Sequence, residues 1–378
     1  MANHAFLSAS ASHRWLACPP SARLCAEVPD QESTYARQGT EAHELCQYLV
    51  EKALGREAAD PTANFEFYDA EMREAAMGYC GFVMEQIAKA KEFCSDPLVC
   101  VEQKLDYSKW VQDGFGTGDC VIVADDTLHI IDMKYGVGVL VSAAGEDGTG
   151  NSQLKCYALG ALDTFGDLYD IRRIKLNIYQ PRRENTDTFE MTAAELLHWA
   201  DEVLAPRAKL AYEGGGEFQA GEHCRFCKIK AACRKRAAYS LGLAKYEFAE
   251  PPSLTTEEIA AILPQIDTLV SWADDIKAYA LERALSGTSY PGFKLVEGRS
   301  VRKYTDEAAV IDAVASEGFD PFEKKVLGIT AMQKLLGKAR FDELLSGLIE
   351  KPKGKPTLVP DSDKRPAIST AKLDFKDK

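Results

Sequence analysis

The sequence predicts an α/β protein with a mixed central sheet, and three observations support this fold class. Short apolar runs rich in β-branched residues, such as residues 120–124 and 128–131, indicate strands. Longer segments that repeat apolar residues at positions three and four apart indicate helices before and after these runs. The resulting order of helix, three strands, helix and strand is typical of a mixed sheet flanked by helices.

The first hundred residues are expected to be irregular at first and helical later. Residues 1–34 show no sustained period, and Thr40 is a good N-cap residue for a helix that would begin there. Residues 69–94 continue the helical pattern. Residues 99–106 then form the first predicted strand.

Residues 117–134 are interpreted as a β-hairpin. Asp125 and Asp126 separate two apolar runs and are polar enough for a two-residue turn. With that turn, the register brings Asp119 directly opposite Asp132. The hairpin therefore predicts two carboxylates on neighbouring strands.

The segment after the hairpin is expected to complete the sheet. Residues 135–151 contain five glycines and are expected to form a flexible loop. A helix is predicted at 152–165, strands near 171–180 and 187–191, and a further helix at 193–212.

The C-terminal part, from about residue 250, is predicted to form a separate, mainly helical region. Pro251 and Pro252 indicate a boundary, and a long helical pattern follows at 255–286. A short β-like piece near 290–304 and two or three helices complete this region. The Lys-, Pro- and Asp-rich tail is expected to be extended or disordered. The predicted parts are a core domain at 1–245, a helical accessory domain at 250–350 and a tail at 351–378.

Composition narrows the classes of function. The 378 residues are 46% hydrophobic, as expected for globular cores, and contain no long uninterrupted apolar stretch that could cross a membrane. We therefore expect a cytosolic protein with no membrane partner.

A net charge of −13 argues against broad, non-specific attachment to nucleic acid, so any such contact must come from local basic patches. Two patches are candidates, although each could be a solvated face: Arg172, Arg173, Lys175, Arg182 and Arg183, and Arg225, Lys228, Lys230, Arg234, Lys235 and Arg236.

Asp119, Asp132 and Lys134 are the residues most indicative of chemistry. Like charges placed directly opposite each other on a hairpin are destabilising unless a cation neutralises them. Lys134 lies two residues beyond Asp132 and so points to the same side of its strand. Two carboxylates and an ammonium around one metal ion suit phosphodiester cleavage. The alternative is a pair of solvated strand-end acids beside a surface lysine.

Eleven cysteines in a cytosolic chain indicate metal ligation or core packing rather than disulfides. Cys224, Cys227 and Cys233 are closely spaced, and Cys18 is a distant fourth candidate; together they could hold a [4Fe–4S] cluster. Structural zinc bound by four cysteines, or by three and His223, is an open alternative, as is packing without metal. The others resemble ordinary buried thiols: Cys25, Cys46, Cys80, Cys94, Cys100, Cys120 and Cys156.

Four further residues could contribute to the hairpin site. His43 is expected in the first turn of its helix and Glu102 in the preceding strand, and either could face the metal. Gln153 and Tyr157 are four residues apart and so lie on one helix face.

Taken in order, these features resemble a known family: Cys18, a G-x-x-x-H motif ending at His43, Glu102, Gly116-Thr117-Gly118-Asp119, Asp132-Met133-Lys134, Gln153-Leu154-Lys155-Cys156-Tyr157 and the three late cysteines. The series resembles the RecB-like branch of the PD-(D/E)XK nuclease superfamily, in particular AddB-type domains and CRISPR-associated exonucleases with an iron–sulfur cluster. The resemblance implies a restriction-endonuclease-like core. Gly118 stands where the superfamily motif has proline. Residues 290–296 and 354–357 resemble an uncharacterised phage and prophage family.

The resemblance also implies roles for these residues. A Mg²⁺ or Mn²⁺ ion would be held by His43, Asp119, Asp132 and the carbonyl of Met133, with Glu102 acting through water; an imidazole ligand favours Mn²⁺. Lys134 would orient the attacking water, and Gln153 and Tyr157 would contact the DNA backbone.

The function so implied is a metal-dependent DNA exonuclease that acts on single strands or duplex ends in phage recombination or DNA processing, in the cytosol of a bacterial host. A phage single-strand annealing protein is a possible partner, and an oligomer is compatible with this role. The alternative is a non-catalytic nucleic-acid-binding or scaffold protein with a structural metal cluster.

Overall fold

The computed structural model describes residues 5–29, 33–242, 255–296, 305–316, 318, 320–322 and 326–349. The chain divides into two compact units, residues 1–295 and 296–378. The division falls after the long helix at 256–285, beyond the boundary expected near residue 250. Pro251, Pro252 and the tail from residue 351 lie outside the described residues.

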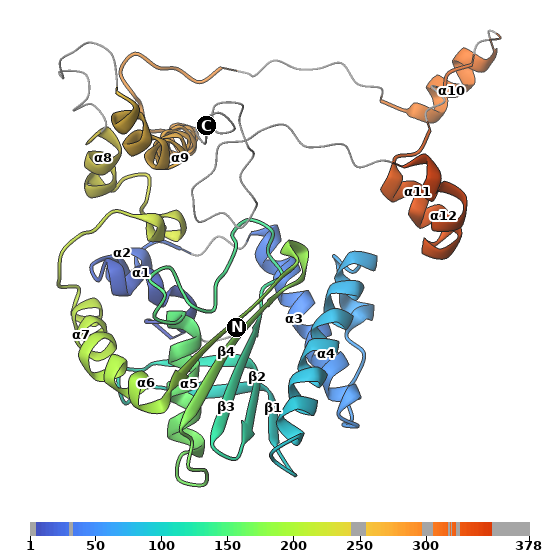
Figure 1. Ribbon diagram of the computed structural model, residues 1–378. Helices are drawn as coiled ribbons and strands as arrows, with labels where there is room; N and C mark the ends of the chain where they lie inside the picture. The colour runs from blue at the N-terminus through green and yellow to red at the C-terminus, as the bar shows by residue number, and fades with distance from the viewer. Residues whose placement is uncertain are drawn as a thin grey trace, which may run out of the picture. The chain divides into compact units, whose positions relative to one another are not determined.

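Five strands form one mixed sheet in sequential order (Figure 1). They are β1 (Leu98–Asp106), β2 (Phe115–Ala124), β3 (Thr127–Met133), β4 (Arg173–Gln180) and β5 (Asn185–Thr192). Only β3 and β4 pair in parallel, and helix α5 (Ser152–Phe165) makes the crossover that a parallel pair requires. The predicted α/β class with a mixed sheet is therefore confirmed, as are the positions of all five strands.

The hairpin of β2 and β3 has the predicted two-residue turn. Ala124 pairs with Thr127, and Asp125 adopts a φ of 49°, which aspartate tolerates better than most residues. The regular ladder ends at Cys120 paired with Ile131, so Asp119 and Asp132 are the next positions along the same register.

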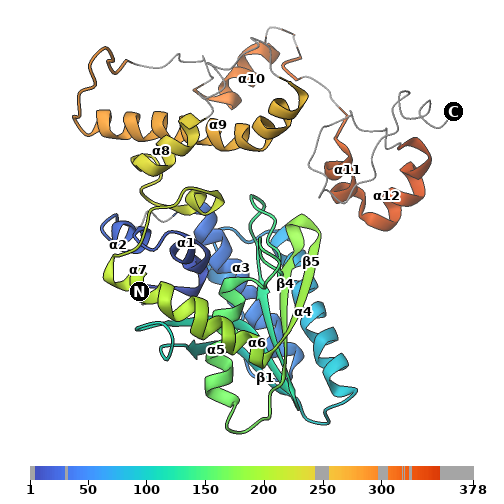
Figure 2. The same cartoon turned by 60° about the vertical axis from the view of Figure 1, so that its left-hand side comes forward.

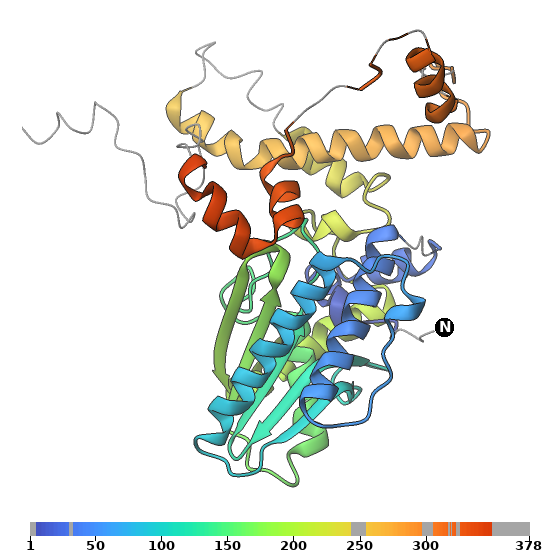
Figure 3. The same cartoon turned by 90° about the vertical axis from the view of Figure 1, so that its right-hand side faces the viewer.

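Helices α3 (Thr34–Ala53) and α4 (Ala70–Lys91) cover one face of the sheet (Figure 3). The expected start at Thr40 is wrong, because the Ser33 hydroxyl already accepts a hydrogen bond from the Ala36 N–H and caps the helix. Gly39 does not interrupt the helix, since one internal glycine costs only about 1 kcal/mol. His43 consequently lies in the middle of α3 and not in its first turn.

The opposite face of the sheet is covered by α5, α6 (Ala193–Trp199) and α7 (Ala205–Glu213) (Figure 2). A π-helical turn at Ala200–Leu204 joins α6 to α7. The expectation that residues 1–34 are mostly irregular is also wrong. The segment forms α1 (Ser12–Ala17) and α2 (Ser21–Ala26), and Trp15 of α1 is fully buried in the core on the α5 side.

Helix α8 (Arg234–Leu241) directly follows Cys233 and is not among the predicted helices. The helices predicted beyond residue 255 are confirmed: α9 (Thr256–Leu285), α10 (Glu307–Ser316), α11 (Ile329–Leu336) and α12 (Lys338–Leu345). The β-like piece expected near 290–304 is not a strand at residues 290–296, and residues 297–304 lie outside the described part. No helix in the described part of the chain is long and apolar enough to cross a membrane.

Candidate metal centre and cysteine cavity

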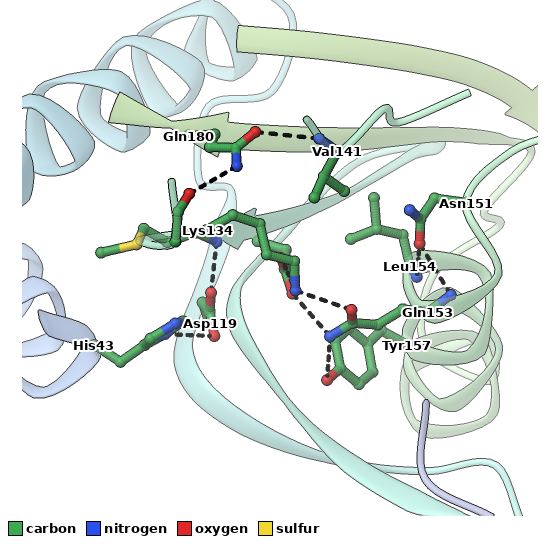
Figure 4. Close-up of polar contacts among 12 residues, drawn as sticks. His43, Asp119, Lys134, Val141, Asn151, Gln153, Leu154, Tyr157 and Gln180 are labelled. Atoms are coloured by element: carbon green, nitrogen blue, oxygen red, sulfur yellow. Dashed lines mark hydrogen bonds and ion pairs between the residues drawn. The ribbon is translucent and has the colours of Figure 1, made fainter. Parts of the chain in front are cut away.

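The candidate metal centre lies at the middle of β2 and the end of β3, between α3 and α5 (Figure 4). His43 reaches it from α3, Glu102 from β1 and Asp119 from β2. One ligand atom from each of these three residues lies within 4.8 Å of the other two. Two carboxylates and an imidazole are a donor set that suits a divalent cation, and imidazole favours Mn²⁺ over Mg²⁺.

Asp119 is the central residue of this group. Its Oδ1 lies 3.3 Å from His43 Nδ1, and its Oδ2 accepts a 2.6 Å hydrogen bond from the Met133 N–H. The Asp119 charge raises the pKa of His43 to about 9, against the effect of burial. Burial alone would raise the pKa of Asp119, but the His43 charge and these hydrogen bonds hold it below its ordinary value.

Glu102 has an unusual backbone conformation, with a φ of 50°. The ladder between β1 and β2 pairs Val101 with Cys120 and Gln103 with Gly118, but omits the position of Glu102 opposite Asp119. Burial, and then the charge of Asp119, raises the pKa of Glu102 to about 7. Strained non-glycine residues often occur at functional sites, because the surrounding structure must hold them in place.

Asp132 and Lys134 belong to a polar network on the α5 side of the centre (Figure 4). Lys134 Nζ lies 2.8 Å from Asp132 Oδ2 and donates a 2.9 Å hydrogen bond to Gln153 Oε1. Gln153 Nε2 donates to Asp132 Oδ1 at 3.2 Å and to the Tyr157 hydroxyl at 3.0 Å. The predictions that Lys134 faces the same side as Asp132, and that Gln153 and Tyr157 share a helix face, are confirmed.

Glycine in the strand before Asp119 makes room for this network. A Cβ at Gly116 would lie 2.6 Å from Cε1 of the Tyr157 ring, so a side chain there would displace Tyr157.

Burial raises the pKa of Asp132. The Lys134 charge opposes this increase, whereas the Asp119 charge adds to it.

The structure therefore brings the predicted residues together, but in two groups. His43, Glu102 and Asp119 form the candidate ligand set, whereas the Asp132 carboxylate contacts Lys134 and Gln153. Met133 enters the site through its N–H. Glu102 was expected to act through water, and its direct proximity to His43 could not be read from sequence spacing.

The four cysteines of the predicted cluster line one small cavity. Cys18 follows α1, whereas Cys224, Cys227 and Cys233 precede α8 and contribute with His223 to the same wall. A hydrogen bond with Cys18 raises the pKa of His223. The remote cysteine and the late triplet, about 200 residues apart in sequence, are thus neighbours in space.

Cys25 is a fifth thiol at this place, although the sequence predicts an ordinary buried thiol there. Its Sγ lies 3.7 Å from Cys227 Sγ, and this hydrogen bond lowers the pKa of Cys25 to about 5. No three cysteine or histidine ligand atoms among the described residues of the cavity lie within 4.8 Å of one another.

The first basic patch is largely neutralised. Ion pairs with carboxylates engage four of its five members: Arg172 with Asp170, Arg173 with Asp126, Lys175 with Glu190 and Arg182 with Glu71. In the second patch, Lys230 and Arg236 both pair with Asp275. A cavity of about 460 Å³ beside α7, lined by Lys109, Lys209, Asp113 and Glu213, has mixed charge and none of the candidate metal ligands.

Fold and site together define a mixed α/β protein with a candidate centre for a divalent metal and a cavity lined by cysteines. Residues 4–366 match the family described as "Protein of unknown function (DUF2800)", and the chain belongs to that family. Among solved structures, the chain is similar to one titled "Crystal structure of SSO0001", at 13% identity and a TM-score of 0.23. That match covers 50% of this chain and 95% of the other.

Proposed function

We propose that this protein is a divalent-metal-dependent deoxyribonuclease of the RecB-like PD-(D/E)XK type, which hydrolyses phosphodiester bonds of single-stranded DNA or of duplex ends. The observation that carries the proposal is the grouping of His43, Glu102 and Asp119 beside an Asp132–Lys134 pair at the end of one hairpin. This combination provides ligands for a cation and a separate cationic group on the other side of the site.

Bound Mg²⁺ or Mn²⁺ supplies Lewis-acid stabilisation of the phosphate and lowers the pKa of coordinated water. His43, Glu102 and Asp119 would hold the ion. Asp132 would hold the Lys134 ammonium through their 2.8 Å ion pair. Lys134 orients the attacking water and offsets charge that develops on the phosphate. Gln153 holds the Lys134 ammonium through the 2.9 Å hydrogen bond and, with Tyr157, faces the DNA backbone.

The cysteine cavity is proposed to hold a [4Fe–4S] cluster on Cys18, Cys224, Cys227 and Cys233, with zinc as the alternative. Its role is to join the N-terminal helices to the segment before α8. Protein purified without oxygen is expected to be brown, with roughly four iron atoms and four sulfides per chain. A colourless protein that contains zinc would favour the alternative.

The test of the proposed activity is incubation of the full chain with end-labelled single-stranded and duplex DNA and Mg²⁺ or Mn²⁺. Asp119→Ala and Lys134→Ala are each expected to lower cleavage about 100-fold or more, because the first removes a ligand of the ion and the second removes the group that orients the water and offsets charge on the phosphate. Circular dichroism and thermal melting check that the variants fold.

Asp170→Ala is the matched control, since it removes an exposed carboxylate away from the site. Full cleavage by either site variant would refute the assignment of that residue. A wild-type protein that binds DNA but never cuts it would support the non-catalytic alternative.

A further inference from the structure

The loop between β3 and α5 is fastened to the sheet, although its glycine content predicts flexibility. The Gln180 side chain is almost fully buried at the end of β4. Its Nε2 donates hydrogen bonds to the carbonyls of Gly136 and Val139 at 3.0 and 2.7 Å, and its Oε1 accepts one from the Val141 N–H at 3.1 Å (Figure 4). One side chain thus holds three points of the backbone directly after Lys134.

The next part of the loop is held in the same way. The Asp187 carboxylate of β5 accepts hydrogen bonds from the Ser142 hydroxyl and the Ala143 N–H, at 2.8 and 2.9 Å. Farther along, the buried Lys155 ammonium donates to the Thr149 carbonyl at 3.2 Å. The loop therefore has a defined backbone path in the segment that directly follows Lys134.

This fixed loop exposes two apolar side chains. Val137 is 41% exposed and Leu140 is 58% exposed, within six residues of Lys134. Hydrogen bonds to Gln180 hold the backbone on either side of each residue, so the exposure does not come from a loose end. These two side chains are therefore held exposed by a fixed backbone and are available for contact with a ligand.

Two arginines lie against the same loop, and neither pairs with a carboxylate among the residues that the structure describes. Arg183 Nη1 donates to the Val137 carbonyl at 3.1 Å, and Arg225 Nη2 donates to the Gly138 carbonyl at 3.4 Å. A carbonyl oxygen carries no net charge, and in the described part of the chain neither guanidinium has a carboxylate within ion-pair distance. They differ in this from Arg172, Arg173, Lys175 and Arg182, whose charges are all compensated.

We propose that Val137, Leu140, Arg183 and Arg225 form a strand-contact surface that binds single-stranded DNA and leads it to the metal centre. The proposal rests on the proposed function and specifies its substrate. Arg183 and Arg225 bind phosphates, and Val137 and Leu140 contact the faces of bases. Base faces are open to such contact only where bases are unstacked, so a single strand or a frayed end binds and an intact duplex does not.

The surface also connects the two candidate sites. Arg225 stands between Cys224 and Cys227 in the short turn Glu222–Phe226, whereas the loop begins directly after Lys134. The position of the Arg225 charge therefore depends on the cysteine segment. A group bound in the cysteine cavity would hold this segment, and with it Arg225, in place for binding the DNA strand.

The test measures binding separately from cleavage. Fluorescence anisotropy of a labelled oligothymidylate is recorded with the full chain in EDTA, so that no metal-dependent cleavage occurs. The double variant Arg183→Ala/Arg225→Ala is expected to weaken binding at least 10-fold. It should also reduce the slope of log K against log salt by about 1.4, as expected for two lost phosphate contacts on a single strand.

The matched control is Arg172→Ala/Arg173→Ala, which removes the same charge. Arg173 begins β4 and Arg172 directly precedes it, so both lie at the end of the strand opposite Gln180, about 23 Å from Gln180 at roughly 3.3 Å per residue. The control is expected to bind within 2-fold of the wild type. An equal loss in both double variants would show that net charge alone matters, and would overturn the proposal.

The apolar residues are tested by Val137→Ser/Leu140→Ser. This variant is expected to bind the oligothymidylate several-fold more weakly with an unchanged salt slope, because no charge is lost. Unaltered binding by this variant, or tighter wild-type binding to a blunt duplex than to the single strand, would contradict the proposal.

Failure of the inference and failure of the proposed function give different results. A wild-type protein that cuts DNA, with Arg183→Ala/Arg225→Ala binding normally, would remove the strand-contact surface and leave the nuclease assignment. A wild-type protein that binds the single strand through these residues without cutting it would do the reverse. A wild-type protein that neither binds nor cuts DNA would overturn both the strand-contact surface and the nuclease assignment.

Discussion

His129 is a polar residue in an apolar position of the sheet. It lies in β3, is only 3% exposed, and neither ring nitrogen has a hydrogen-bond partner among the described residues. Burial, with the nearby Lys175 charge, lowers the pKa of His129 to about 4. The folded protein therefore binds this proton less readily than the unfolded chain, in which the pKa is near 6.5.

The sign of the pH effect follows from this difference. The stability contribution of neutral His129 is complete above pH 6.5 and is lost as the pH falls toward 4. Between pH 7 and 5, the wild type is expected to lose about 2 kcal/mol of unfolding free energy more than His129→Leu does. Urea unfolding of both proteins at pH 7 and pH 5 measures this difference in the loss of unfolding free energy. Equal losses would show that His129 is not the group responsible.

At the scale of elements, α5 lies unusually close to β1. A Cβ at Gly160 would lie 2.9 Å from Leu105 Cβ and 3.1 Å from both the backbone N and O of Asp106, and none of these three strand atoms can move aside easily. The close approach matters for the site, because α5 carries Gln153 and Tyr157. Gly81 of α4 offers a contrast, since it is exposed and nothing lies within 4 Å of a Cβ built there.

Two glycine-to-alanine substitutions test the close packing of α5. Gly160→Ala is expected to lower the unfolding free energy by roughly 1–3 kcal/mol through overpacking. Gly81→Ala is expected to raise it by about 0.5–1 kcal/mol, because alanine favours the helix and meets no neighbour. Urea denaturation measures both. Stabilisation by Gly160→Ala would mean that α5 can move away from β1 at little cost.

At the scale of the whole molecule, one carboxylate links α9 to the cysteine segment. Asp275 of α9 lies 2.8 Å from Lys230 Nζ and 2.6 Å from Arg236 Nη1, and the Arg236 side chain is only 4% exposed. These two ion pairs hold the pKa of Asp275 below its ordinary value, against the effect of burial. The division of the chain after α9 is consistent with this link.

Replacement of Asp275 by Asn is expected to release α9, since it leaves the buried Arg236 charge without a partner. The expected cost is roughly 2–3 kcal/mol, somewhat below that of a fully buried pair. Faster amide hydrogen exchange in α8 and α9, with slow exchange retained in the sheet, would report the release. Asp274→Asn is the control, because its pair with Lys277 is exposed. The same exchange pattern in both variants would argue against the link.

Much of the fold and part of the site follow from sequence alone, because the patterns concerned are local. Short apolar runs located β2 and β3, and the period of two along a strand placed Lys134 beside Asp132. The four-residue spacing placed Gln153 beside Tyr157 on α5. The start of α3 was misplaced, because Ser33 and Thr40 are both plausible caps and only the observed hydrogen bond distinguishes them.

Contacts between distant segments were decided by tertiary structure. Glu102 joins His43 and Asp119 because β1 adopts a left-handed backbone conformation at Glu102. No periodic pattern in the sequence predicts that conformation. Cys25 meets Cys227, and Arg225 meets the loop after β3, only because packing brings segments far apart in sequence to one place. Periodic patterns specify which face of a strand or helix a residue occupies; what lies opposite that face depends on how the elements pack.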